Sequence, residues 1–491
     1  MSKQAMNDWM YQSLTNVVLH RSARKVAMPT VLKRIEETVR KSDKTGLDYV
    51  VKMTSSLIGN LVRSMIRNMD HGFVSQHAAR TVLDTLVKTS YVNPASAQAR
   101  EEYTRRFGTE PPGFCVLSPT QRCNLNCTGC YAGSGADTRD TLPYAVCSRL
   151  LNEMHDVLGG SFIVISGGEP FLYRSEGKGL LDLTREHHGM YFLTYTNGQL
   201  IDEEVARELG ALGNLTPAIS IEGREAETDR RRGKGVFSKV LRTTERLKKH
   251  GVPFGLSVTV TKENAELLSG RSFYEYCFEE LGATYMWMFH LMPIGRASAT
   301  MDLMVTPEQR RRLFETWERL TLDTDYFVGD FWNSGVAAHG CIAYGRPGGY
   351  FYVNWNGNVT PCAFVPYYKH NIVDLYAQGR SITDALMSDL FSRGRHWQQE
   401  YLRGSALPGN LLMPCSIRDH YAEFRENVMD PNVQPENEPA RQAIEDPDYY
   451  RRLTEFDTQL SSIMTPLWEE RVGGSAGARA KAGDQARKAA V

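Results

Sequence analysis

Three cysteines in one short stretch, Cys123, Cys127 and Cys130, are the residues of this sequence best suited to metal or redox chemistry. Their Cys-x3-Cys-x2-Cys spacing lets three thiolates converge on one inorganic cluster from a single loop. A four-iron cube commonly takes four cysteine ligands, so a cube held by three leaves one iron open to a small molecule. We therefore predict an iron–sulfur cluster with an open coordination site in this stretch.

A structural zinc site is the main alternative for these thiols. Zinc prefers four closed ligands, often supplied by paired Cys-x2-Cys hooks, and no fourth Cys or His lies between or beside the three cysteines. The chain has nine cysteines in 491 residues, too few and too unevenly spaced for a disulfide framework. The spacing favours the cluster over zinc. Cys115, Cys147 and Cys277 lie inside predicted strands or helices, which is typical of buried packing thiols.

Short apolar runs alternate with amphipathic stretches between about residues 113 and 292. Such alternation predicts a parallel sheet whose strands are joined by right-handed helical crossovers. The predicted strands are 113–118, 162–166, 191–195, 216–221, 254–260 and 284–289, and the predicted helices are 144–158, 202–212, 236–250 and 270–281. Six such repeats predict an α/β fold, a partial (β/α)6 TIM-like barrel.

Polar residues with chemical potential follow the first four predicted strands. The cysteine stretch follows the first, Gly167-Gly168-Glu169-Pro170 the second, Asn197 the third and Glu222 the fourth. In barrels of this kind the active site gathers at the carboxyl ends of the strands. We therefore expect all four segments on one face.

The regions outside the predicted barrel differ from it in sequence pattern. We assign residues 1–95 to a helical N-terminal extension, 110–300 to the core, 301–430 to a smaller domain, 431–470 to a helical segment and 471–491 to a disordered tail. The smaller domain begins with a helix at 306–321, capped by Thr306, and contains a hairpin at 350–360 around an Asn-Gly pair.

Charge is distributed unevenly along the chain. Residues 1–90 carry 14 Lys or Arg against 7 Asp or Glu, a surplus of 7, and residues 471–491 carry 5 against 1, a surplus of 4. Because the chain is neutral overall, the middle carries −11, which disfavours nucleic acid as a partner. The N-terminal helices are either a cap packed on the core, which we favour, or a basic amphipathic surface for a membrane or partner.

No run is apolar enough to span a membrane, and no secretory signal is evident. We therefore expect a cytoplasmic protein, with peripheral membrane contact through the basic N-terminus as a further option.

Taken together, the cysteine stretch and Gly167-Gly168-Glu169-Pro170 resemble the radical S-adenosylmethionine (SAM) superfamily. The resemblance implies that Cys123, Cys127 and Cys130 hold a [4Fe–4S] cluster whose open iron binds SAM. It also implies reductive cleavage of SAM to a 5′-deoxyadenosyl radical, which removes hydrogen from an unactivated carbon.

Carried over to this chain, the resemblance implies a set of SAM contacts. Gly168 and Glu169 would meet the methionine amino group, Ser220 the ribose and Arg232 the methionine carboxylate. Asn197 and Glu222 complete the expected cofactor-binding set. Glu222 is a departure, because many relatives carry Asp there.

The spacing of Cys341, Gly357 and Cys362 resembles the start of the auxiliary-cluster domain called SPASM. Of the later cysteines of that domain only Cys415 is present, so the resemblance favours the shorter, twitch-like form with one auxiliary cluster, a [4Fe–4S] centre. Three cysteines leave its fourth ligand open. His339, His370, His420 and substrate are candidates, although ordinary roles are more typical of such histidines.

The sequence thus predicts a radical SAM enzyme whose auxiliary cluster anchors substrate or relays an electron. We lean towards a hydrophobic or lipid substrate, because no peptide-binding winged-helix pattern precedes the barrel. The alternative is a maturase of a peptide or protein, and a less favoured one is a non-catalytic iron–sulfur electron-transfer protein. An electron donor such as flavodoxin or ferredoxin is the expected partner.

Overall fold

A ten-stranded sheet forms the centre of the protein, seen in a computed structural model that describes residues 3–403 and 409–488. Its strand order is β13-β11-β10-β1-β2-β5-β6-β7-β8-β9. The six strands predicted from sequence lie next to one another and run parallel: β1 (Phe114–Leu117), β2 (Phe162–Ile165), β5 (Tyr191–Thr196), β6 (Leu215–Ser220), β7 (Gly255–Val260) and β8 (Tyr285–His290). The α/β class and the parallel core are thereby confirmed.

The sheet is wider than the six predicted repeats. β9 (Val328–Asp330) adds to β8, and β10 (Tyr350–Val353) adds to β1, both in parallel. β10 and β11 (Asn358–Thr360) form the predicted hairpin, and β13 (His370–Asn371) follows it. Within the described residues the two edge strands do not pair, so the barrel stays open.

This pairing joins segments on both sides of residue 301 in one sheet. β9 and β10, from the range 301–430, pair with β8 and β1, whose outer backbone groups would otherwise be unpaired. Two small sheets lie apart from it, β3 (Arg174–Ser175) with β4 (Lys178–Gly179) and β12 (Tyr367–Tyr368) with β14 (Gln434–Pro435).

Helices follow the core strands largely where amphipathic periodicity predicts them. The core helices are α6 (Tyr144–Asp156), α7 (Leu180–Glu186), α8 (Glu203–Leu212), α9 (Glu225–Arg232), α10 (Val236–Lys249), α11 (Ala265–Leu268) and α12 (Arg271–Glu275), the last continued by a π-helical turn at Tyr276–Glu280. α13 (Pro307–Asp323) begins as predicted: the Thr306 side chain accepts a hydrogen bond from the Gln309 amide, and the Gln309 side chain bonds back to the Thr306 amide.

The two faces of the sheet carry two different apolar cores. On β8, Met286 and Met288 point into the core beneath the helices, whereas Tyr285, Trp287 and Phe289 point to the other face. This alternation follows from the two-residue repeat of a strand. The second face also collects side chains from the hairpin and from all three C-terminal cysteines, so it is where the two cysteine sets could meet.

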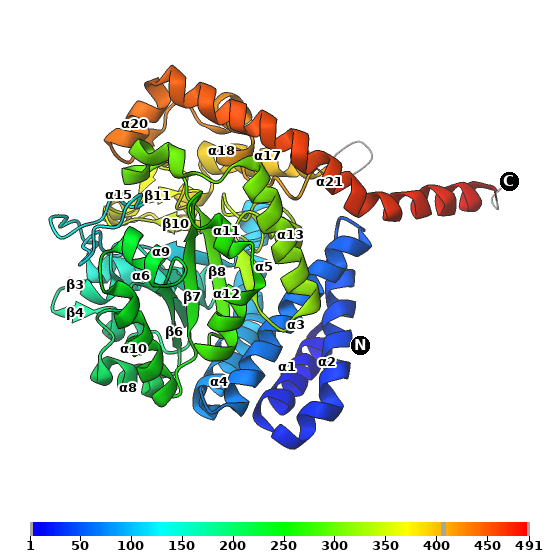
Figure 1. The fold of residues 1–491 in the computed structure, drawn as a ribbon, viewed down its shortest axis with the longest axis horizontal. Helices are drawn as coiled ribbons and strands as arrows, with labels where there is room; N and C mark the ends of the chain where they lie inside the picture. Colours follow the sequence, from blue (N-terminus) through cyan, green and yellow to red (C-terminus); the bar gives the residue numbers. More distant parts are fainter. Residues whose placement is uncertain (1–2, 404–408, 489–491) are drawn as a thin grey trace.

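The N-terminal helices pack on one side of this core (Figure 1). They are α1 (Lys3–Leu19), α2 (Arg21–Ser42), α3 (Asp48–Asp70), α4 (Gln76–Val82), a π-helical segment at Leu83–Val92, and α5 (Pro94–Phe107). α3 docks through buried amides: Asn60 donates to the Thr321 and Tyr326 carbonyls, and Asn68 donates to the Gly282 carbonyl. These contacts favour the reading of this region as a cap. No described helix is long and apolar enough to cross a bilayer.

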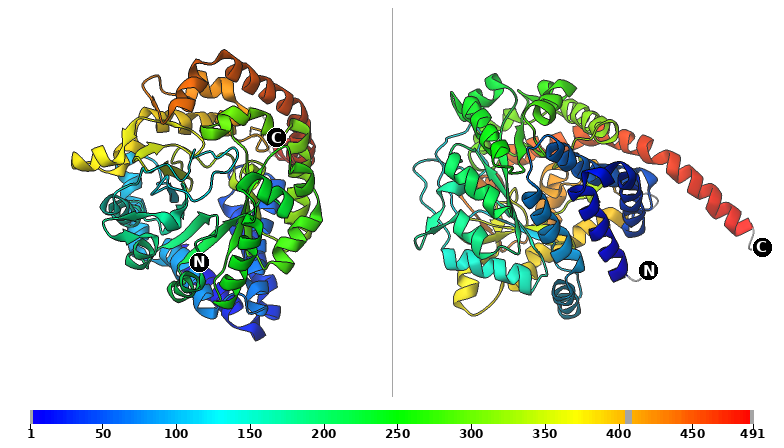
Figure 2. Two further views of the ribbon diagram at one scale, coloured as in Figure 1. Left: turned by 60° about the vertical axis from the view of Figure 1, so that its left-hand side comes forward. Right: turned by 90° about the horizontal axis from the view of Figure 1, so that it is seen from below.

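The C-terminal part consists of short helices under one long helix. They are α14 (Gly335–Ala338), α15 (Ile372–Ala377), α16 (Ile382–Leu386), α17 (Asp389–Arg403), α18 (Ser416–Asp419), α19 (Tyr421–Glu423) and α20 (Glu438–Glu445), with a π-helical turn at Phe424–Val428. In the core, 3-10 turns at Pro170–Leu172 and Gly295–Leu303 follow β2 and β8. α21 (Pro447–Lys488) runs across them and projects beyond the body (Figures 1 and 2).

α21 continues through residues 471–488 of the tail that is expected to be disordered. Ala, Arg and Lys in this segment are good helix formers, whereas its four glycines are not. Residues 489–491 lie outside the described residues.

One partly buried carboxylate gives this part a pH-dependent stability. Burial raises the pKa of Glu436 to about 8, and its side chain accepts a hydrogen bond from the Asn354 amide, 2.6 Å away in the hairpin turn. A carboxyl whose pKa is raised on folding stabilises the fold at low pH, and this contribution is lost as pH rises from the unfolded value through 8. We expect Glu436→Gln to raise the thermal midpoint more at pH 9 than at pH 5; equal gains would contradict this.

Candidate active site

The loop between β1 and α6 carries Cys123, Cys127 and Cys130, all unpaired and partly exposed. Neighbouring segments fix its backbone at three points. The Cys123 amide donates to the Gly135 carbonyl at 3.1 Å, the Thr128 amide donates to the Arg231 carbonyl at 3.0 Å, and Arg296 donates to the Cys127 carbonyl at 2.9 Å. The loop is thus held rigidly at the carboxyl edge of the sheet.

The thiols of this loop are set up for a cationic partner. Burial raises the pKa of Cys123 to about 12, and the other two cysteines and Glu169 add to the rise. A thiolate here therefore requires a positive centre, which the irons of a cluster supply. Within the described residues, no group of three or more His, Cys, Asp or Glu is arranged to hold a metal ion.

Gly168 lets the loop after β2 lie directly against the cysteine loop. Its amide donates to the Thr120 carbonyl at 2.9 Å, and the next amide, of Glu169, donates to the Arg122 carbonyl at 2.7 Å. A Cβ at Gly168 would lie 2.1 Å from the Arg122 oxygen, closer than any side chain can approach. Glycine is required here because two backbones touch.

Glu169 ties the ends of β2 and β5 together. Its carboxylate is fully buried and accepts hydrogen bonds from the Thr196 hydroxyl at 2.7 Å and from the Asn197 amide at 2.9 Å. Burial raises its pKa, while these donors oppose the rise. Glu169 therefore orients Asn197 in addition to any contact with a cofactor.

Asn197 links this network to the first cysteine. Its side-chain amide donates to Asn124 at 2.7 Å and lies 4.0 Å from the Cys123 sulfur. Ser220 ends β6 on the same edge of the sheet and is largely buried. The structure thus places the predicted residues Gly168, Glu169, Asn197 and Ser220 at the strand ends around the cysteine loop.

Glu222 is engaged in ion pairs and is therefore not a free carboxylate that could bind a ligand. It is 1% exposed, and its Oε1 accepts from both Arg231 and Arg232 at 2.6 Å, while its Oε2 accepts from the Thr259 amide at 2.9 Å. The negative charge of Glu222, followed by Cys127 and Cys130, raises the pKa of Arg232. Glu222 therefore holds two guanidinium groups beside the cysteine loop.

Sequence reasoning missed Arg231. Its backbone and side chain both contact the cysteine loop, through Thr128 and the Gly129 carbonyl. The run of three arginines at 230–232 was the available signal, but spacing alone does not tell which arginine turns inward. A pocket of about 240 Å³ adjoins this group and is lined by Thr128, Glu222, Arg231, Asn264 and Leu303 among others.

Cys341, Cys362 and Cys415, which we call the second cysteine set, lie in the apolar cluster on the face of the sheet that carries Tyr285 and Phe289. Cys362 follows β11, and its sulfur lies 2.8 Å from the Tyr350 hydroxyl. The pKa of Cys415 is raised well above its ordinary value, first by burial and then by the charges of Asp419, Cys341 and Cys362. The three thiols therefore share one electrostatic environment despite their separation in sequence.

The three histidines considered as a fourth ligand have other neighbours. His339 lies 3.9 Å from Asp43, and the His420 ring shares a hydrogen bond with the Met413 carbonyl. The pKa of His370 is lowered by burial and by Arg380 and Lys369. Tyr350, which the sequence did not single out, brings its hydroxyl into contact with the sulfur of Cys362 in this set.

A row of aromatic rings joins the two cysteine sets, and we call it the aromatic wall: Tyr131, Tyr195, Phe289, Phe331, Trp332 and Phe364. Tyr131 directly follows Cys130, and its ring centroid lies 5.6 Å from that of Phe364, two residues after Cys362. Phe289 continues the row, 5.4 Å from both Tyr195 and Phe331. These last three rings are only half-buried, so accessible space adjoins the wall.

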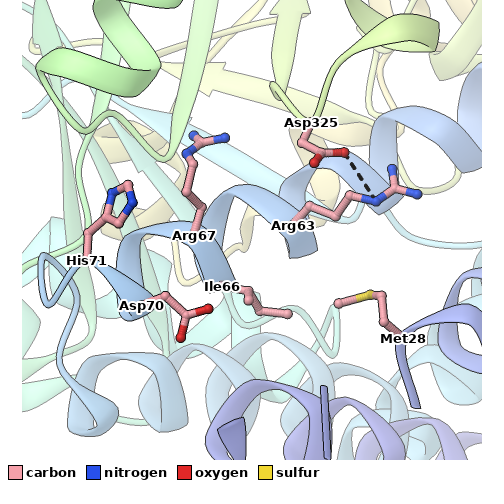
Figure 3. A pocket seen from close by; sticks show the side chains of 7 residues that line it. All are labelled: Met28, Arg63, Ile66, Arg67, Asp70, His71 and Asp325. Atoms are coloured by element: carbon pink, nitrogen blue, oxygen red, sulfur yellow. Dashed lines mark ion pairs between the residues drawn. The ribbon is translucent and has the colours of Figure 1, made fainter. Parts of the chain in front are cut away.

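A larger hollow of about 490 Å³ lies elsewhere, between α2, α3 and the segment before β9 (Figure 3). Its side chains carry both signs of charge, and Arg63 and Asp325 pair across it at 3.4 Å. No cysteine lines it. We therefore place the chemistry at the strand ends rather than here.

Comparison with known proteins identifies the domain that carries the first site. The family model of the radical SAM superfamily matches residues 117–268, which span the cysteine loop and the ends of four core strands. The chain carries a radical SAM domain. This superfamily is one of enzymes that use SAM with a [4Fe–4S] cluster, which the three free thiols fit.

Two curated relatives and one solved structure illustrate the similarity. The chain is 33% identical over 252 residues to mycofactocin maturase MftC of Mycolicibacterium smegmatis, covering 50% of this chain and 60% of the relative. It is 29% identical over 216 residues to Fe-coproporphyrin III synthase of Methanosarcina barkeri, covering 42% and 51%. The match thus spans less than two thirds of either relative.

Streptococcus suis SuiB bound to its precursor peptide SuiA shares the fold, with a TM-score of 0.51 and 18% identity over 65% of this chain and 74% of that one. At this identity the likeness concerns the fold alone.

Proposed function

We propose that this protein is a radical SAM enzyme that abstracts hydrogen from an unactivated carbon of a hydrophobic substrate, with one auxiliary cluster held by Cys341, Cys362 and Cys415. When bound at Cys123, Cys127 and Cys130, the [4Fe–4S] cluster with SAM supplies a 5′-deoxyadenosyl radical for this step. The protein's own part is to bind, orient and exclude water.

The strand-end residues have distinct tasks in this proposal. The backbone at Gly168 and the side chains of Ser220 and Arg232 contact SAM. Glu169 and Asn197 orient the loop around Cys123, because they bond to each other and to Asn124. Glu222 acts through Arg231 and Arg232, so it is a positioning residue.

The aromatic wall is the observation that carries the substrate class. It lies between the two cysteine sets, where substrate must sit for the first to attack it and the second to anchor it or accept its electron. Half-buried Tyr195, Phe289 and Phe331 offer faces for apolar contact and no charge for an ion pair. This supports a hydrophobic or lipid substrate.

A peptide or protein maturase is the second candidate function. It is supported by the similarity to a mycofactocin maturase, and an aromatic wall also suits an aromatic or aliphatic side chain of a peptide. In either case an external reductant such as flavodoxin or ferredoxin would reduce the first cluster. Membrane contact through the basic N-terminal helices is proposed only with the lipid substrate.

Anaerobic reconstitution with iron and sulfide, followed by SAM and dithionite, tests the proposal. We expect 5′-deoxyadenosine to form slowly, and faster when a membrane-lipid extract is added than when a peptide extract is added. Stimulation by the peptide extract alone would support the maturase instead. No 5′-deoxyadenosine under any condition would refute both.

Phe289→Ala tests the wall directly. A buried phenylalanine ring contributes about 1.5–3 kcal/mol, so its loss should raise the lipid-extract concentration for half-maximal stimulation by about tenfold or more. The slow, substrate-free formation of 5′-deoxyadenosine should remain. Phe107→Ala, which removes a half-buried ring from α5 far along the chain from either cysteine set, is the matched control and should leave both quantities unchanged. An unchanged requirement for extract in Phe289→Ala would exclude the wall as the binding surface.

A further inference from the structure

Arg418 is a fully buried cation without a hydrogen-bond partner. It lies in α18, three residues after Cys415, and its side chain is 0% exposed. None of its three guanidinium nitrogens bonds to any group within residues 3–403 and 409–488. Buried arginines are almost always paired, since burying an unpaired charge costs several kcal/mol or more.

Aromatic rings flank the guanidinium but do not neutralise it. Its central carbon lies 5.0 Å from the ring centroid of Trp332 and 5.6 Å from that of Phe456. Such contacts stabilise a cation by about 0.5–2 kcal/mol, less than an unpaired buried charge costs. Trp332 belongs to the aromatic wall, and its ring centroid lies 5.2 Å from that of Phe364 in a tilted arrangement.

The acidic groups around Arg418 are already engaged. Asp419 is paired with Arg310 and accepts from the Cys415 amide. Asp330 accepts from His290, from Asn333 and from the Trp332 amide. None of them forms an ion pair with Arg418 in the described structure.

Asp457 is the remaining candidate, and it is a weak one. Its Oδ2 accepts from the Tyr421 amide, burial raises its pKa to about 8, and its Oδ1 has no hydrogen-bond partner within the described residues. Asp457 forms no ion pair with Arg418 in the described structure, so the guanidinium still lacks a partner in contact with it.

The cysteine set next to Arg418 can supply a negative charge. Cys415 is the N-cap residue of α18, three residues before Arg418, and it packs in the same apolar cluster as Cys341 and Cys362. Three thiolates around an iron–sulfur centre leave a net negative charge beside the guanidinium.

We propose that Arg418 is the counter-charge of the auxiliary iron–sulfur cluster and sets its reduction potential, with its free N–H groups directed to cluster sulfur or to an anionic group bound at the open iron. This inference rests on the auxiliary cluster of the proposed function. A fixed positive charge stabilises the reduced, more negative state, so Arg418 raises the potential and favours electron uptake by this cluster.

A redox titration isolates this effect. The full chain carrying Cys123→Ala, Cys127→Ala and Cys130→Ala retains only the auxiliary set, and its midpoint potential is followed anaerobically by electron paramagnetic resonance. In this background we expect Arg418→Met to shift the midpoint to a more negative value and Arg418→Lys to shift it less. Arg425→Met is the matched control and should leave it unchanged, because Arg425 donates to the Ala443 and Ile444 carbonyls.

Thermal unfolding provides a second readout that does not depend on activity. In the iron-free chain Arg418→Met should raise the midpoint, since it removes an unpaired buried charge; in the loaded chain this gain should vanish or reverse. Equal potentials in Arg418→Met and the parent, or the same thermal gain with and without iron, would overturn the inference alone. Absence of iron and sulfide from the triple variant would instead overturn the auxiliary cluster, and the inference with it.

Discussion

Cys127→Ala should abolish 5′-deoxyadenosine formation, lowering it at least about a thousandfold, because two thiolates cannot hold a cube with an open iron. Cys127 is the middle cysteine of the loop; Arg296 donates to its carbonyl, and Arg231 donates to the Gly129 carbonyl two residues later. The loop therefore cannot rearrange to offer another donor. Product is measured by chromatography after anaerobic reconstitution and reduction, and iron content should fall by roughly four per chain in the same sample.

Cys277→Ala is the control for this variant. Its thiol is fully buried behind β8 among apolar side chains and does not face either cysteine set. The substitution leaves a small cavity, so a modest loss of stability and full product formation are expected. If Cys127→Ala still made 5′-deoxyadenosine at a rate near that of Cys277→Ala, the assignment of the loop as the SAM-cluster site would be wrong.

The core strands and the cysteine loop could be predicted because the signals are local. A buried parallel strand is a short apolar run, and β2, at Phe162–Ile165, is such a run, followed after Ser166 by two glycines. The cysteine spacing lies within a single loop, so no long-range contact is needed to see it. This is why the six strands and the order of strand-end segments follow from sequence.

The pairing of strands that lie far apart in the sequence could not be predicted. The hairpin at Tyr350–Thr360 is evident from its Asn-Gly turn, but nothing local to it says that β10 lies parallel to β1. That register places Tyr350 against Phe114 at a ring separation of 5.3 Å and brings its hydroxyl to Cys362. The aromatic wall arises from this pairing, and composition alone could not reveal it.

The sequence also could not tell which charged side chains point into the protein. Arg230, Arg231 and Arg232 are consecutive, yet the first is exposed and pairs loosely with Glu263, while the other two are buried on Glu222. Similarly, the sequence around Arg418 gives no sign that this side chain differs from a surface charge, yet it is fully buried in the fold. Burial of charge is decided by what packs over a segment, which in this case is α21.

The ion pairs of Glu222 lead to the second prediction with a large expected effect. Glu222→Ala should lower the free energy of unfolding by about 3–5 kcal/mol, because it leaves Arg231 and Arg232 buried with no partner for either charge. Those arginines anchor the cysteine loop, so SAM binding and 5′-deoxyadenosine formation should fall together. Chemical denaturation of the reconstituted protein measures the first effect, and equilibrium binding of SAM measures the second.

Two further variants help to interpret this result. Glu222→Gln keeps the hydrogen bond from the Thr259 amide and the volume but not the charge, so it should lie between the parent and Glu222→Ala in stability. Glu225→Ala removes an exposed carboxylate from the first turn of α9, the helix that carries Arg231 and Arg232, and should change stability by less than about 0.5 kcal/mol. If Glu222→Ala were as stable as Glu225→Ala, the two arginines would have to find another anion, and the cysteine loop would owe its position to its backbone hydrogen bonds alone.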